Sequence, residues 1–344
     1  MEANMPRRRR WNRLGNFLFA PLTMTTLKQP SFEEIQDLVA DRERKTQYVS
    51  ADDHKISPDG VLSYGAAAGA RLTRYGFSSY MNILDVPMRF IEEESAFRPD
   101  LAARIVNARA NNRRGRGLKF VMYDNKVVGI VSEKYAVLSN QGIISVMPDL
   151  LERHPMRPSS FSMEGVRMRG RFVDKNVVKV RGDDPHHTGV DFVNSMEGYN
   201  AFKTSAYVLR LVCTNGVVSS VKTHIGRIVH RGDTDDIIKR AAACIETSFI
   251  ASGSMISTID KAAHYVLSDT SMRDIGRGIA ERFSMVLANK SLSNARAEAP
   301  VTGVTAFDIA NGLTSQAHEQ DSMDRAREME SYAFDIMRRA AKAA

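Results

Sequence analysis

The chain has 344 residues, of which 43% are hydrophobic and 26% are charged. These values are ordinary for a globular protein and exclude a disordered or fibrous chain. The two cysteines, Cys213 and Cys244, are too few for a disulfide framework or a four-cysteine zinc site, so we expect a reducing cytoplasm. No uninterrupted apolar run approaches the roughly 20 residues that a membrane helix needs, and we expect no membrane association.

The net charge of +8 is distributed unevenly along the chain. Residues 104–231 contain 21 Lys and Arg against 10 Asp and Glu, whereas residues 31–103 and 232–344 are both acidic. A concentrated positive field attracts polyanions, and nucleic acid is the commonest of them. The alternative is a solvated basic face that the acidic flanking segments partly neutralise.

Residues 1–30 are predicted to be a basic arm. The run Arg7–Arg10, followed by the apolar stretch Leu14–Ala20, imitates a signal peptide. A glycine and an asparagine interrupt this stretch and no small-residue cleavage pattern follows, so we do not expect secretion. Met24 is an alternative start, which would make the first segment dispensable.

Residues 31–74 are predicted to be a helix and a polar linker. Ser31 and Glu34 have the spacing of a capping box, which predicts a helix that ends near Arg44. Residues 45–60 are polar and contain a Pro-Asp-Gly turn signal, which predicts a linker or a long loop.

Residues 75–344 are predicted to form a single α+β domain. A helix over 99–110 ends in the basic, glycine-containing loop 111–117. Residues 120–131 predict a hairpin, because Asp124-Asn125 suits a primed two-residue turn between two apolar runs. Further predicted elements are a short helix over 141–151, a second hairpin from 166–173 and 177–181, and strands at 192–194 and 206–212.

The short connections make the β-rich region, 118–220, mainly antiparallel. Residues 233–344 are predicted to be helical, with Asp233, Asp235 and Asp236 in a first turn. Helices are expected over 237–256, 271–287 and 305–341, with loops near 291–303. We expect this helical part to pack on the sheet rather than to form a domain of its own.

Alternating arginines are the most informative feature of the second predicted hairpin. Arg167, Arg169 and Arg171 share one face because side chains alternate along a strand. A three-residue turn would place Lys179 and Arg181 on the same face, whereas a two-residue turn would place them on the opposite face. Opposed like charges cost stability, so the shared face favours a polyanion nearby. The alternative is an ordinary solvated edge.

The patterns typical of catalysis or metal binding are weak. The adjacent His186 and His187 would point to opposite faces of a strand, so both cannot easily bind one metal ion. His224 and His230 are candidate bases, but neither has an obvious serine or cysteine nucleophile partner. Cys213 follows an apolar run and is expected to be a buried thiol. We therefore predict no cofactor, no metal and no catalytic residues.

Three motifs in fixed order carry a family resemblance. They are 128–135 (VGIVSEKY), 210–216 (RLVCTNG) and 229–232 (VHRG), and a long helix follows them. Over residues 75–340 the chain resembles the phage/plasmid-like family labelled domain of unknown function nine-three-two. The resemblance implies a phage or mobile-element setting in a bacterial host cell, and it implies no activity. A basic antiparallel sheet with helices is also broadly similar to Rad52-type single-strand annealing proteins.

The functional hypothesis is a non-catalytic DNA-binding protein that assists recombination or single-strand annealing. The nucleic-acid partner is expected to be single-stranded DNA rather than duplex, and a homo-oligomer fits the same hypothesis. The alternatives are a structural or interaction protein that acts through its C-terminal helices and, third, an enzyme that uses His224 or His230. The residues expected to contact phosphates are Arg113, Arg114, Arg116, Lys119, Arg167, Arg169, Arg171, Lys179, Arg181, Lys222, Arg227 and Arg231.

Overall fold

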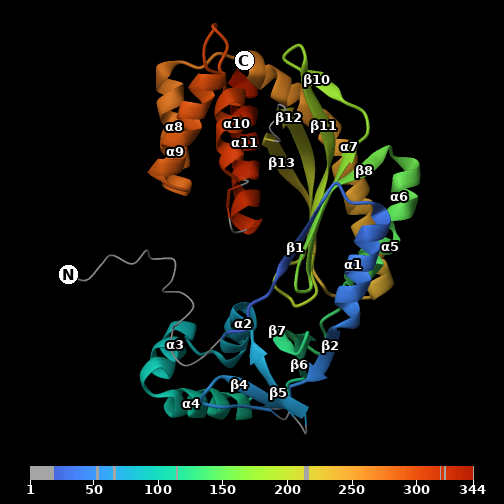
Figure 1. Ribbon diagram of the computed structural model, residues 1–344, viewed down its shortest axis with the longest axis vertical. Helices are drawn as coiled ribbons and strands as arrows, with labels where there is room; N and C mark the ends of the chain where they lie inside the picture. The colour runs from blue at the N-terminus through green and yellow to red at the C-terminus, as the bar shows by residue number, and fades with distance from the viewer. Residues whose placement is uncertain are drawn as a thin grey trace, which may run out of the picture.

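The computed structural model describes residues 19–343, apart from 52–53, 65–66, 114, 213–216, 318 and 321–322. It has an α+β architecture with two sheets arranged end to end (Figure 1). A small sheet with its own helices lies at one end of the long axis, and a larger sheet covered by helices on both sides forms the rest. The predicted fold class, with antiparallel strands between N-terminal and C-terminal helices, is confirmed.

The small sheet has six strands in the order β2-β6-β7-β5-β4-β3. Their bounds are β2 Thr46–Ser50, β3 His54–Ile56, β4 Val61–Tyr64, β5 Ala67–Leu72, β6 Leu118–Tyr123 and β7 Lys126–Ser132. One face packs on the helices α2 Arg74–Leu84, α3 Met88–Phe97 and α4 Pro99–Asn111. The β6–β7 hairpin turns at Asp124-Asn125, where both residues have positive φ, as the predicted primed turn requires.

The large sheet has seven strands, with the path β1-β8-β9-β11-β12-β13 and β10 paired to β11. The bounds are β1 Met24–Lys28, β8 Met156–Glu164, β9 Arg167–Asp174, β10 Val178–Val180, β11 Asp184–Ser195, β12 Phe202–Val212 and β13 Val217–Ile228. All its pairings are antiparallel. The chain forms the edge strand β1, leaves to build the whole small sheet, and returns at β8, so the small sheet is an insertion between two paired strands.

One face of the large sheet is covered by α1 Phe32–Arg44, α5 Asn140–Ser145, α6 Met147–Arg153 and the long α7 Thr234–His264. The alternation of β9 and β11 places Phe172 and Phe192 on this face, where they stack in the core. Within the described residues, α7 is the one helix long and apolar enough to cross a membrane. Its buried stripe, which includes Ile237, Ile245 and Ile259, faces the sheet.

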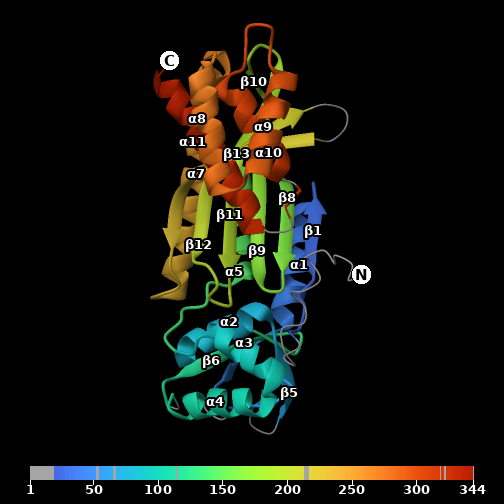
Figure 2. The ribbon, with the colours of Figure 1, turned by 90° about the vertical axis from the view of Figure 1, so that its left-hand side faces the viewer.

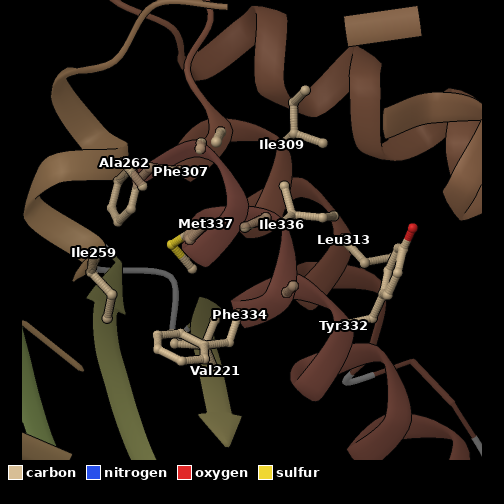
Figure 3. Close-up of a cluster of buried hydrophobic side chains, with 14 of the residues drawn as sticks. Val221, Ile259, Ala262, Phe307, Ile309, Leu313, Tyr332, Phe334, Ile336 and Met337 are labelled. Carbon is tan, nitrogen blue, oxygen red and sulfur yellow. The ribbon is translucent and has the colours of Figure 1, made fainter. Parts of the chain in front are cut away.

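The remaining helices are α8 Asp269–Arg282, α9 Met285–Glu298, α10 Ala306–Ala317 and α11 Met323–Ala343. The last two pack on α7 and on the edge strand β13. Figure 3 shows this core, where Phe307 and Met337 approach Ile259 and Val221. Figure 2 shows that these helices leave part of the sheet face uncovered between themselves and the small sheet.

Several local predictions are confirmed. Ser31 and Glu34 form the predicted capping box at the start of α1. The helix expected over 99–110 is α4, and the region expected over 141–151 forms the two short helices α5 and α6. The helical C-terminal part packs on the sheet, although the segment 305–341 forms two helices and the segment 291–298 is helical.

Other predictions are wrong. The segment 45–60, predicted to be a linker, contains β2 and β3, and β4 starts directly after it; they pair with neighbours that follow later in the chain. Residues 24–28 of the predicted arm form the edge strand β1, and Phe19 packs on Phe77. The second hairpin does not exist, because β9 pairs with β8 and β11 while β10 pairs with β11 alone.

The hairpin between β11 and β12 joins the two sheets. At its tip, the Tyr48 hydroxyl donates to the Met196 carbonyl at 3.2 Å, and the Tyr135 hydroxyl donates to the Ser195 carbonyl at 3.1 Å. Gly129 of β7 lies so close that an added Cβ would sit 2.4 Å from the Glu197 carbonyl oxygen. The tip therefore docks on the small sheet through close backbone contact.

Candidate nucleic-acid interface

The face of the large sheet opposite α7 carries most of its charge. Arg171 of β9 pairs in register with Asp191 of β11, and both point to this face. Tyr207 and Lys222 form a cross-strand pair on β12 and β13 of the same face. The helix α11 crosses here and adds Arg327 and Glu330, which are three residues apart and therefore neighbours on the helix surface.

These side chains form a buried ion-pair group, called here the charged network: Arg169, Arg171, Asp191, Lys222, Arg327 and Glu330. Asp191 Oδ2 lies 2.6 Å from Arg169 Nη2 and 2.9 Å from Arg171 Nε. Glu330 Oε2 accepts from Lys222 Nζ at 2.7 Å and from Arg169 Nη2 at 3.1 Å, and its other oxygen contacts Arg171. Arg327 reaches Asp191 Oδ1 at 3.2 Å.

The charged network holds four cations and two carboxylates. Burial opposes ionisation of Asp191, but Arg169, Lys222 and the other cations hold its pKa well below the usual range. The pKa of Glu330 is also held well below its usual range, against burial, by Arg171 and Lys222. Burial lowers the pKa of Lys222 and of Arg327, and neighbouring cations add to the effect. The network thus carries more positive than negative charge in a place with little water.

Three more basic side chains, called here the rim, lie beside the charged network: Lys203, His224 and Arg227. Lys203 of β12 and Arg227 of β13 are a directly opposed cross-strand pair. His224 shares their face because a register shift after Thr204 leaves one extra residue on β13. Lys203 is partly buried, and His224 and Arg227 are exposed.

The rim is not balanced by paired carboxylates among the described residues. Lys203 Nζ donates to the Asn200 side-chain oxygen at 3.2 Å, and the negative charge of Asp324 favours the charged form of Lys203. Burial and the field of Arg327 nevertheless lower the pKa of Lys203 and of His224. Asp324 itself accepts a hydrogen bond from the Tyr199 hydroxyl at 2.9 Å.

An aromatic platform adjoins the rim through Tyr199. Its ring is 38% exposed and meets Tyr75 of α2 edge to face, with ring centroids 4.6 Å apart. The Arg167 guanidinium lies 3.8 Å from the Tyr199 ring centroid and is paired with the buried Glu197. Burial raises the pKa of Glu197 even though Arg167 opposes the shift. The platform and the rim are neighbours, because Lys203 donates to the side chain of Asn200, the residue after Tyr199.

The structure corrects the predicted arginine face. Arg167, Arg169 and Arg171 do share one face, as predicted, but the last two are buried in ion pairs with Asp191 and Glu330 instead of facing solvent. The reason is that α11 covers this part of the sheet. Lys222, also expected to contact phosphates, is buried in the same network.

Lys179 and Arg181, the two cations expected on the next strand, do not join the charged network. Lys179 is exposed and pairs with Asp183 at 2.7 Å. Arg181 donates to Asp308 of α10 at 2.9 Å and to the Ala263 carbonyl, so it anchors the C-terminal helices. Neither alternative for the turn applies, because β10 does not pair with β9.

The basic loop of the small sheet is separate from the large sheet face. Arg116 is exposed and Arg113 and Lys119 are partly buried, whereas Arg114 lies outside the described residues. Arg231 is exposed just after β13. The phosphate contacts expected for these basic residues remain predictions.

The two candidate catalytic histidines have different surroundings. His224 belongs to the rim and is surrounded by cations. His230 is buried, contacts the Tyr135 hydroxyl through Nδ1, and has an Nε2 atom with no hydrogen-bond partner among the described residues. Burial lowers the pKa of His230 to about 4. Cys213 lies outside the described residues.

Sequence reasoning missed Lys203, Tyr199, Arg327, Asp191 and Glu330 as members of one site. A partial signal existed for Lys203, which directly follows Phe202 in β12 and therefore points to the opposite face. No local signal connects Glu330 to β9, because the two are about 160 residues apart.

The comparisons with known proteins place the chain in a family without assigning an activity. No curated protein and no solved structure matches it. A family model, described as Domain of unknown function (DUF932), matches residues 127–335. This match starts in β7 and ends in α11, so it contains the β8–β13 part of the large sheet, the charged network and the rim. The chain belongs to the DUF932 family.

Proposed function

We propose that this chain is a non-catalytic DNA-binding protein that holds a single strand along the rim and the aromatic platform. The observation that carries the proposal is the pair Lys203 and Arg227, two cations opposed across neighbouring strands beside an already positive buried network. Opposed like charges destabilise a sheet unless an anion lies between them. A phosphate bound there would remove the repulsion.

The platform favours single strands over duplex DNA. Tyr199 presents a partly exposed ring that Arg167 and Tyr75 hold in place from behind and from the side. Bases stack on such rings when they are not paired, and each stacked base contributes about 1–3 kcal/mol. A phosphate on the rim and a base on Tyr199 are adjacent parts of one strand. A role in phage or plasmid recombination or annealing belongs to the same proposal and rests on resemblance alone.

The direct test is binding of a single-stranded oligonucleotide across a salt series. Lys203→Ala with Arg227→Ala is expected to weaken binding by about tenfold or more and to reduce the salt slope by about 0.7 for each lost phosphate contact. The matched control is Lys239→Ala with Arg240→Ala, which removes the same charge from the exposed face of α7. Equal losses in both variants would show a general charge effect and sink the proposal.

A separate pair of variants tests the aromatic platform. Tyr199→Ala is expected to weaken single-strand binding by about tenfold, whereas Tyr199→Phe keeps the ring and loses only the hydrogen bond to Asp324. Binding of duplex DNA should change little in either variant. Absence of any single-strand retention by the wild-type protein at low salt would contradict the proposal outright.

A further inference from the structure

A groove opens between the antiparallel helices α8 and α9. It has a volume of about 520 Å³, and Ala280, Met285 and Leu292 contribute apolar lining. Met285 is 64% exposed, which is high for a large apolar side chain. Arg273, Arg277 and Glu281, which follow one another at one-turn intervals on α8, stand along the groove. The groove therefore has an apolar lining flanked by two arginines and one glutamate.

The helix α3 has complementary features on its solvent face. Phe90, Glu93 and Phe97 are spaced three and seven residues apart, so they lie on one side of the helix. Phe97 is 86% exposed and Phe90 is 43% exposed, with the Glu93 carboxylate between them. Asp100 follows at the start of α4 and is also exposed. This helix face is apolar with an acidic component, which can pair with the two arginines that outnumber Glu281 in the groove.

The helices that carry these two surfaces lie on the same side of the molecule, at its two ends. Figure 2 shows α8 and α9 at one end and α3 at the other, with the sheet between them. We infer that α3 of one copy docks in the α8–α9 groove of a second copy. Two surfaces on one side suit a two-fold axis, which forms the same contact twice in a closed dimer. This inference is independent of the proposed DNA binding.

The assignment to a second copy follows from charge and from side-chain type. In the dimer, Glu93 of one copy meets the wall formed by Arg273 and Arg277 of the other. Glu93 already pairs with Arg89 at 2.8 Å, and Arg277 with Asp274 at 3.6 Å, both within exposed helical turns. Such exposed pairs are weak and exchange partners at little cost. The aromatic rings supply the larger part of the contact.

Sedimentation of the full chain over a concentration series tests the inference. The wild-type protein is expected to shift from monomer to dimer, and Phe97→Glu and Met285→Glu should each weaken the dimer by about tenfold or more. The control is Ile250→Glu, which changes an equally exposed apolar residue on α7. A wild-type protein that stays monomeric throughout overturns the inference, as does an equal effect of the control.

A charge exchange separates docking from damage to the fold. Arg277→Glu and Glu93→Arg are each expected to weaken the dimer, and the double variant should recover most of the loss because each contact again pairs opposite charges. Thermal melting of all variants checks that the fold is kept. Failure of the double variant to recover, with normal melting, would place the contact elsewhere.

Discussion

At the scale of residues, the charged network is organised around its two carboxylates. Asp191 and Glu330 form ion pairs with four cations. Each carboxylate therefore has several partners, and the cations share the two carboxylates. Removing a cation leaves both acids paired and lowers the excess of positive charge. Removing an acid leaves four buried cations with a single counterion.

This imbalance predicts unequal costs. Asp191→Asn should reduce the free energy of unfolding by about 3–5 kcal/mol, the range seen when one partner of a buried pair is lost. Arg169→Met, which keeps much of the volume, should cost only about 1–2 kcal/mol through lost hydrogen bonds. Urea unfolding of both variants measures the difference. Equal costs, or a larger cost for Arg169→Met, would contradict the excess of positive charge.

Local residue signals were reliable where partners are near in the chain. The capping box of Ser31 and Glu34 and the turn at Asp124-Asn125 involve residues no more than three apart, and both could be predicted. The alternation of Arg169 and Arg171 correctly predicted a shared face. The same alternation could not predict that α11 covers this face, because α11 and its Glu330 lie at the C-terminal end of the chain, far from β9 in the sequence.

At the scale of elements, the largest error was to miss the strands β2 to β5 of the small sheet, whose β6–β7 hairpin was predicted. Its strands β3 and β4 have only 3 and 4 residues, and polar residues such as Lys55 and Ser63 face solvent between buried ones. Short strands of this kind carry almost no periodic signal. The pairing of Lys203 with Arg227 was missed for a related reason, since it depends on a register shift that the sequence does not reveal.

The docking of the β11–β12 hairpin on β7 yields a second prediction. Gly129→Ala should lower the free energy of unfolding by about 2 kcal/mol or more, because the new methyl group would overlap the Glu197 backbone. Gly253→Ala in α7 is the control, since nothing lies within 4 Å of its added Cβ, and it should stabilise the helix by up to about 1 kcal/mol. Similar melting temperatures for the two variants would show that the hairpin tip can move away from β7 at little cost in free energy.

At the scale of the whole molecule, the segment before β1 contributes to the core. Phe19 packs against Phe77 at a centroid distance of 5.3 Å and lies under the Arg74 guanidinium. The Ala20 amide donates to the Leu72 carbonyl at 3.0 Å, and Leu22 joins the apolar cluster between the two sheets. The expectation of a dispensable arm therefore does not hold for residues 19–23.

Deletion of residues 1–23 is accordingly expected to destabilise the protein by about 2 kcal/mol or more, because a partly buried aromatic side chain and a backbone hydrogen bond are lost. Differential scanning calorimetry of the shortened and full chains gives the comparison. An unchanged transition would mean that the small sheet does not need Phe19 and Leu22.

The insertion of the small sheet between β1 and β8 has a consequence for the order of folding. All strands of the small sheet are complete by Ser132, whereas β1 has no partner until β8 is made at residues 156–164. During synthesis from the N-terminus, the small sheet can form while β1 waits, and the large sheet closes only after this delay. Contacts that join distant segments form slowly because the intervening chain must first be ordered. The first unit able to fold is therefore the one that interrupts the chain between the edge strand of the larger sheet and its neighbour.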